Sequence, residues 1–184
     1  MSEAMVHATR KAAQASGGRP VPASNLHVTL AFLGSVPERR VAELAEIARS
    51  AAAGGSLELA FDHLEYWRAV HLLCALPAES PPPVVAFAQG LQEGLVARGF
   101  VPDAERRSSP GTKATRRFRP HVTLARGVSP VNGAMAIGPV TWSFADFVLV
   151  DSRMLPEGSC YTVLERFPLG HSSRMPQPAG SSPC

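Results

Sequence analysis

The pentapeptide His27-Val28-Thr29-Leu30-Ala31 returns unchanged as His121-Val122-Thr123-Leu124-Ala125. An identical run of five residues is improbable by chance in a chain of 184 residues, and histidine occurs only six times in it. Self-similarity at one large interval indicates two related halves, because a solenoid needs three or more short repeats. The sequence therefore predicts two similar lobes, each contributing one histidine and one threonine.

Both copies have the alternation of apolar and polar residues that is typical of a β-strand. Side chains two positions apart project from the same face of a strand. His27 and Thr29 are therefore expected to project together, and His121 and Thr123 to repeat this arrangement. If the two lobes face each other across a cleft, two imidazoles and two hydroxyls converge on it.

These residue types suit acid–base chemistry at a phosphate. Histidine titrates near neutrality, so that one imidazole can accept a proton while the other donates one. Threonine hydroxyls can donate hydrogen bonds to phosphoryl oxygens. A single copy would more often be a hydrogen-bonded core histidine beside a threonine with high strand propensity. The repetition favours a function, because packing does not require two strands to carry the same polar pair.

The segments from Asn25 to Gly34 and from Arg119 to Arg126 resemble the paired His-x-Thr-x motifs of the two-histidine (2H) phosphoesterase superfamily. They are most similar to its RNA 2',3'-cyclic phosphodiesterase branch, the LigT/ThpR-like proteins. The similarity runs from about Gly17 to Leu169.

The resemblance implies hydrolysis of RNA 2',3'-cyclic phosphodiester ends to 2'-phosphomonoesters, without a metal or other cofactor. It assigns proton donation to His27, proton acceptance to His121, and phosphate binding to Thr29 and Thr123. The residues alone leave open which histidine is the acid. Relatives often carry an arginine near the phosphate at the position of Arg126, although strict alternation points Arg126 away from His121.

We expect an α+β fold with two pseudo-symmetric lobes of antiparallel sheet and flanking helices around a central cleft. The domain should span residues 1–169, with motifs at 27–30 and 121–124, and residues 170–184 should form a disordered tail. The expected helices cover residues 1–18, 37–53 and 84–98. The expected strands cover 26–33, 57–61, 70–76, 120–126, 140–150 with a bend near residue 146, and 161–167. Relatives usually begin with a short apolar strand, which is missing here.

Two further segments are candidates for RNA contacts. Trp67 lies in an expected hairpin or loop over residues 65–68, where it either packs beneath the turn or stacks on a base. The basic loop 103–119 leads directly into His121, and it includes Arg117 and Phe118. It is either an ordinary solvated loop or a surface that follows an RNA backbone. Phe118 would stack on a base or anchor the loop.

Composition sets the remaining limits. Hydrophobic residues make up 45% of the chain and the formal net charge is +3, which fits a phosphate-bearing partner without establishing one. The three cysteines, at positions 74, 160 and 184, have no metal-ligand spacing. No signal peptide or membrane-spanning stretch is visible. We expect a cytoplasmic monomer whose partner is RNA with a 2',3'-cyclic phosphate end, tRNA fragments among the candidates, and no membrane.

Three other functions remain open. The first is an RNA-end-binding module without turnover, and the second is a metal-dependent hydrolase that uses His27, His121 and a carboxylate. The third is a 2H enzyme that acts on small cyclic nucleotides or on ADP-ribose cyclic phosphate, or that ligates RNA through 2'-5' linkages.

Overall fold

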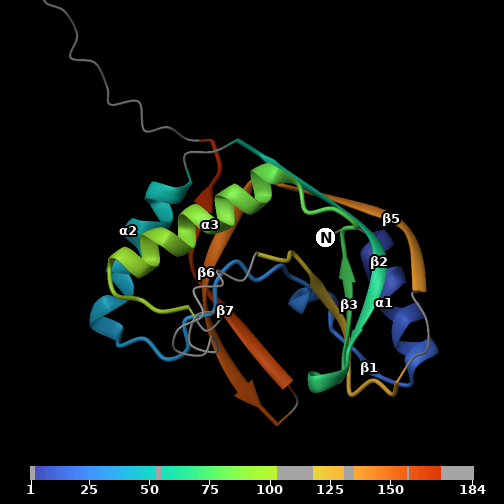
Figure 1. Cartoon of the computed structure of the whole chain (residues 1–184). Helices are drawn as coiled ribbons and strands as arrows, with labels where there is room; N and C mark the ends of the chain where they lie inside the picture. Colours follow the sequence, from blue (N-terminus) through green and yellow to red (C-terminus); the bar gives the residue numbers. More distant parts are fainter. Residues whose placement is uncertain (1–2, 53–54, 103–117, 131–134, 157, 171–184) are drawn as a thin grey trace, which may run out of the picture.

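The computed structural model describes residues 3–52, 55–102, 118–130, 135–156 and 158–170. It confirms the α+β class, with one five-stranded antiparallel sheet in the order β1-β4-β3-β2-β5 and a two-stranded sheet β6-β7 (Figure 1). The helices are α1 (Glu3–Ser16), α2 (Val41–Ala51) and α3 (Pro82–Ala97), with short 3-10 turns at Ala23–Asn25, Glu38–Arg40 and Arg68–Val70. The strands are β1 (Arg19–Pro20), β2 (Leu57–Trp67), β3 (Leu72–Leu76), β4 (Val122–Arg126), β5 (Met135–Phe144), β6 (Asp146–Leu155) and β7 (Gly158–Pro168).

Helix α1 covers one face of the five-stranded sheet. Its buried side includes Met5, Ala12 and Ala13, which pack into the main core. The chain leaves the helix at Gly17, whose positive φ of 64° is a conformation that glycine adopts without strain. A Cβ at Gly18 would lie 2.8 Å from Val128, so the close approach of this connection to the sheet requires glycine. The helix expected over residues 1–18 is confirmed.

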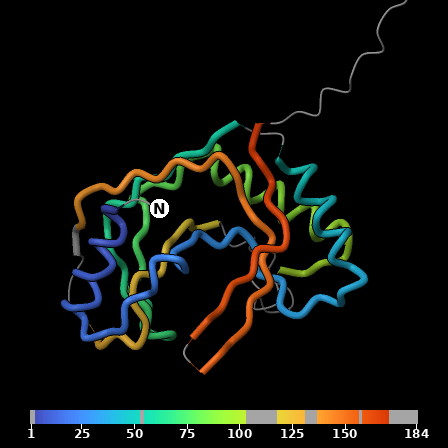
Figure 2. The backbone as a smooth tube through the Cα atoms, turned by 180° about the vertical axis from the view of Figure 1, so that it is seen from behind, coloured from blue at the N-terminus to red at the C-terminus, as the bar shows by residue number. Residues whose placement is uncertain are grey.

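Helices α2 and α3 form the second layer, at the other end of the molecule (Figure 2). Leu44 and Ile47 of α2 pack against Leu91 and Leu95 of α3. Burying four such aliphatic side chains contributes on the order of 2 kcal/mol each. This apolar contact holds the two helices together. Both helices were expected from the periodicity of their apolar residues.

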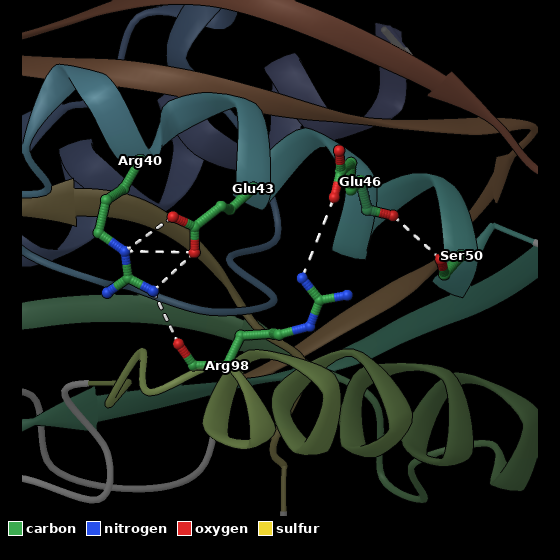
Figure 3. Close-up of polar contacts among 5 residues, drawn as sticks. All are labelled: Arg40, Glu43, Glu46, Ser50 and Arg98. Carbon is green, nitrogen blue, oxygen red and sulfur yellow. Dashed lines mark hydrogen bonds and ion pairs between the residues drawn. The ribbon is translucent and has the colours of Figure 1, made fainter.

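Polar contacts also connect α2 and its preceding turn to the end of α3 (Figure 3). The guanidinium group of Arg40 donates to the Glu43 carboxylate at 2.8 Å and to the Arg98 carbonyl at 2.7 Å. The same group lies 3.9 Å from the centroid of the Phe100 ring. Arg40 therefore connects the start of α2 to the end of α3.

The second sheet is a hairpin that packs on these helices. Phe147 and Leu149 of β6 and Phe167 of β7 lie on the face toward α2 and α3. Residues 140–150 were expected to form one bent strand, and this expectation is wrong. The chain leaves β5 at Phe144 and enters β6 of the other sheet at Asp146. The change of apolar phase near residue 146 marks this crossing between sheets.

The first motif is not a regular strand, contrary to expectation. Between residues 26 and 33 only Val28 forms a β-bridge, to Val122. Pro20 and Pro22 precede a 3-10 turn that redirects the chain, so the segment meets the edge of β4 only briefly. A strand needs several consecutive ladder bonds, and a single bridge does not supply them.

The segment 65–68 is also different from the expected loop. Residues 65–67 continue β2, and Trp67 pairs with Leu72 of β3. The turn follows at residues 68–71, where His71 has a φ of 51° and shares a hydrogen bond of 3.1 Å with the Tyr66 hydroxyl. Trp67 is thus held by the sheet, which gives its ring a fixed position.

Several expectations fall on residues that the structure does not describe. They are the basic loop up to Arg117 and the tail from residue 171. The first described element is α1, and the single domain over residues 1–169 stays a prediction. In the described part of the chain, no helix is long and apolar enough to cross a membrane.

Candidate active site

The second motif forms β4 of the five-stranded sheet, and the first motif runs antiparallel beside it (Figure 1). Their pairing centres on Val28 and Val122, whose side chains pack in the core. Antiparallel pairing around this bridge places His27 opposite Thr123 and Thr29 opposite His121. Thr123 contacts Cys74, and His121 contacts Trp67, on the face of the five-stranded sheet that is opposite α1, which we call the site face. The structure thus brings together the four residues expected at the site.

Both histidines make the same local hydrogen bond. Nδ1 of His27 lies 2.7 Å from the Asn25 carbonyl oxygen, and Nδ1 of His121 lies 2.9 Å from the Arg119 carbonyl oxygen. A carbonyl oxygen only accepts, so Nδ1 carries the proton in each ring. This assignment makes Nε2 the unprotonated nitrogen of each ring when the histidine is neutral.

The residues that supply these carbonyls are themselves tied to neighbouring strands. The Asn25 side-chain amide donates to the Ser159 carbonyl of β7 at 2.8 Å. The Arg119 guanidinium donates to the Glu65 carboxylate of β2 at 2.6 Å. Each histidine is therefore oriented by a residue two positions earlier, which is anchored outside the motif.

Each histidine also contacts one aromatic ring. The ring of His27 meets the edge of Tyr161 at a centroid distance of 4.9 Å, and that of His121 meets Trp67 at 4.5 Å. The Trp67 Nε1 atom is buried and has no hydrogen-bond partner among the described residues. The contact places Trp67 beside His121, and stacking of Trp67 on an RNA base stays a prediction.

The two histidines differ in exposure. His27 is exposed, while His121 is partly buried. Burial is the main cause of a lowered pKa at His121. The hydrogen bond to the Arg119 carbonyl opposes this shift, and the charge of His27 adds to it. At neutral pH His121 is therefore predominantly neutral, which is the state required of a proton acceptor.

Cys74 packs directly behind the site. Its Sγ lies 3.8 Å from the Thr123 hydroxyl, and its side chain is fully buried. Burial raises the pKa of Cys74 to about 12, so the thiol stays protonated at neutral pH. Cys74 is therefore a small core residue.

Comparisons with known proteins identify the family. A family model described as "LigT like Phosphoesterase" matches residues 3–71. A protein of Thermus thermophilus named RNA 2',3'-cyclic phosphodiesterase is 33% identical over 98% of this chain and 91% of its own length. The chain belongs to the LigT-like phosphoesterase family.

Other members of the LigT-like family agree with this placement. A protein of Escherichia coli, also named RNA 2',3'-cyclic phosphodiesterase, is 30% identical over 83% of this chain and 80% of its own length. The crystal structure of E. coli LigT complexed with 3'-AMP has a TM-score of 0.71 and 26% identity, and the match covers 91% of this chain and 90% of that one. By family membership the chain is an enzyme of the phosphodiesterase class.

Arg126 lies on the site face, contrary to the expectation from strict alternation. Cys74 pairs with Thr123, but the next pair is Leu73 with Ala125, so Leu124 is an extra residue in a bulge. The bulge reverses the alternation beyond it. Arg126 then pairs with Leu72 and shares the face of Thr123. Nothing in the sequence signals this bulge.

The other two candidates for RNA contacts, Phe118 and Arg117, have different outcomes. Phe118 is buried in the main core, so it anchors the chain before His121 and does not offer its ring to a base. Arg117 lies outside the described residues. Sequence reasoning missed Tyr161, Asn25 and Glu65 as parts of the site. The only sequence signal available was the matching position of Asn25 and Arg119, two residues before each histidine.

No group of three or more potential metal ligands is present among the described residues.

Proposed function

We propose that this enzyme hydrolyses RNA 2',3'-cyclic phosphodiester ends to 2'-phosphomonoesters, with His27 as proton donor and His121 as proton acceptor. One observation carries the proposal. Two paired antiparallel motifs each supply one imidazole. In each ring Nδ1 is hydrogen-bonded to a carbonyl oxygen, which leaves Nε2 for the substrate. In-line displacement at phosphorus requires an acid and a base on opposite sides of the phosphorus atom.

The difference in exposure supports the assignment of roles. The Nε2 atom of neutral His121 removes a proton from water, and the oxygen of that water bonds to phosphorus. The bond from phosphorus to O3' breaks, and Nε2–H of His27 gives its proton to the leaving O3'. The products are a 2'-phosphomonoester and a free 3'-hydroxyl group. Proton exchange with solvent then restores both histidines.

The two threonines and Arg126 complete the proposed phosphate site. The hydroxyls of Thr29 and Thr123 lie beside the histidines and can donate to the non-bridging oxygens as negative charge develops there. Arg126 shares the site face and supplies positive charge. The reaction needs no metal in this scheme, because protein groups perform both proton transfers and hold the phosphate.

The names of two relatives support RNA ends as the substrate. Both are called RNA 2',3'-cyclic phosphodiesterase, and the chain covers most of the length of each. The structure of LigT with 3'-AMP supports a nucleotide ligand in this family. We therefore propose RNA that ends in a 2',3'-cyclic phosphate as the partner.

The test is phosphorus NMR of a dinucleotide with a 2',3'-cyclic phosphate end, incubated with the enzyme and EDTA. The proposal predicts conversion of the cyclic resonance to that of a 2'-monophosphate. Binding without conversion would indicate an RNA-end-binding module. Conversion only after a divalent metal is added would contradict the metal-free mechanism, and a 3'-monophosphate product would contradict cleavage of the bond to O3'.

A further inference from the structure

Arg19 and Arg126 form an unusual pair beside the site. Arg19 of β1 lies directly opposite Arg126 of β4 in the antiparallel ladder, and both side chains are exposed. Residues directly opposite each other project from the same face, with Cβ atoms about 5 Å apart. Because the bulge in β4 puts Arg126 on the site face, Arg19 lies there too.

Among the residues that the structure describes, neither Arg19 nor Arg126 forms an ion pair with a carboxylate. Other arginines in the described ranges do form ion pairs with acidic residues: Arg119 with Glu65, Arg153 with Asp151 and Arg166 with Asp146. No such pair or side-chain hydrogen bond involves Arg19 or Arg126 among the described residues. Like charges directly opposite each other repel, so this arrangement favours an anion between them.

The position of the pair relates it to the catalytic groups. Thr123 and Arg126 lie opposite Cys74 and Leu72, which are two residues apart on β3, so they are separated by about 7 Å along the strand. This is comparable with the length of one extended nucleotide. The histidines and threonines already surround the position proposed for the cyclic phosphate. An anion at the arginine pair is therefore suited to be the next phosphate along the chain.

We infer that Arg19 binds the internucleotide phosphate on the 5' side of the terminal ribose, with Arg126 lying between this phosphate and the cyclic one. A guanidinium group binds phosphate through two parallel hydrogen bonds, so Arg19 can donate to both non-bridging oxygens of a phosphodiester. The inference rests on the proposed function and extends it, since it makes an RNA chain a better substrate than a single nucleotide. Arg19 is then a substrate-binding residue that does not take part in the chemical step.

The experiment compares two substrates with Arg19→Gln. One is a nucleoside 2',3'-cyclic phosphate, which lacks an internucleotide phosphate, and the other is the corresponding dinucleotide. We expect kcat/KM for the dinucleotide to fall about tenfold, as for a lost hydrogen bond to a charged group. Turnover of the mononucleotide should stay unchanged, which also verifies that the variant is folded. The slope of log kcat/KM against log salt for the dinucleotide should decrease in magnitude by about 0.7.

Two variants serve as controls. Arg10→Gln removes the same charge from an exposed position on α1, on the opposite side of the sheet, and should change neither substrate. Arg19→Lys keeps the charge without the paired donors, and should recover part of the loss. Equal losses for both substrates, or no loss with the dinucleotide, would overturn the inference. Failure of the wild-type enzyme to turn over the dinucleotide would instead contradict the proposed function.

Discussion

The two halves of the site share the same local hydrogen bonding of a histidine but differ in how deeply that histidine is buried. His27 and His121 make the same Nδ1 hydrogen bond to the carbonyl two residues earlier, and each contacts one aromatic ring. His27 is nevertheless exposed, while His121 is partly buried against Trp67. The repeat therefore accounts for the two similar histidines, and the surrounding residues differentiate them. This difference supports an acid–base assignment that the repeat alone leaves open.

The largest effects should come from the histidines themselves. We expect His27→Ala and His121→Ala each to abolish measurable turnover, because each removes one of two required proton transfers. Both side chains lie at least partly exposed on the site face, so the free energy of unfolding should change by less than about 1 kcal/mol. Steady-state kinetics and thermal unfolding check the two expectations. Near-normal activity in either variant would refute the assignment of both roles.

The threonines should give the next largest effects. Thr29→Ala and Thr123→Ala are each expected to lower kcat by about 10²-fold to 10³-fold, as is typical for loss of one donor to a developing oxyanion. Thr29→Ser and Thr123→Ser keep the hydroxyl groups and serve as matched controls. If the serine variants lose as much activity as the alanine variants, the hydroxyls are not the important groups.

Trp67 should affect the pH dependence more than the maximal rate. Trp67→Leu exposes His121 to water, which removes much of the burial that lowers its pKa. A proton acceptor must be neutral, so activity falls as the pH drops below its pKa. Raising that pKa moves the acidic limb of the pH profile of kcat/KM to higher pH. Tyr161 contacts His27 instead of His121, so Tyr161→Leu should leave the acidic limb of the profile in place.

An unchanged acidic limb in Trp67→Leu would mean that Trp67 does not control the environment of His121. An equal shift in Tyr161→Leu would mean that the two half-sites are not distinct.

The anchoring residues should have the smallest effects. The Arg119–Glu65 ion pair is largely exposed, with side-chain exposures of 58% and 38%. Such a pair is worth about 0.2–1 kcal/mol, so Arg119→Gln and Glu65→Gln should each lower kcat less than about fivefold. A double-mutant cycle on kcat measures whether the two losses overlap. Strictly additive losses would show that the ion pair does not orient His121.

The repeated motif could be found from the sequence, whereas its surroundings could not. The His-x-Thr pattern is local, and the pairing of its two copies follows the antiparallel arrangement of Val28 and Val122. Tyr161 and Trp67 reach the histidines from positions far along the chain, so only the tertiary fold reveals these contacts. Arg126 was expected on the wrong face because one extra residue in a bulge reverses the alternation.

Expectations about regular elements failed where neighbouring segments decide the outcome. The first motif has the composition of a strand, but it forms a single bridge because a strand exists only through its ladder partners. Residues 65–67 were expected in a hairpin or loop, but they pair with β3 and extend β2. Periodicity records which residues favour burial, and it does not record which segments pair.

The most direct test of the acid–base assignment uses a dinucleotide whose cyclic phosphate carries sulfur in place of O3'. A thiolate leaves without protonation, so this substrate does not need the proton donor. The assignment predicts that His27→Ala regains turnover of the sulfur substrate, measured with a thiol reagent, while His121→Ala stays inactive. Recovery in His121→Ala, with none in His27→Ala, would contradict the account and reverse the two roles.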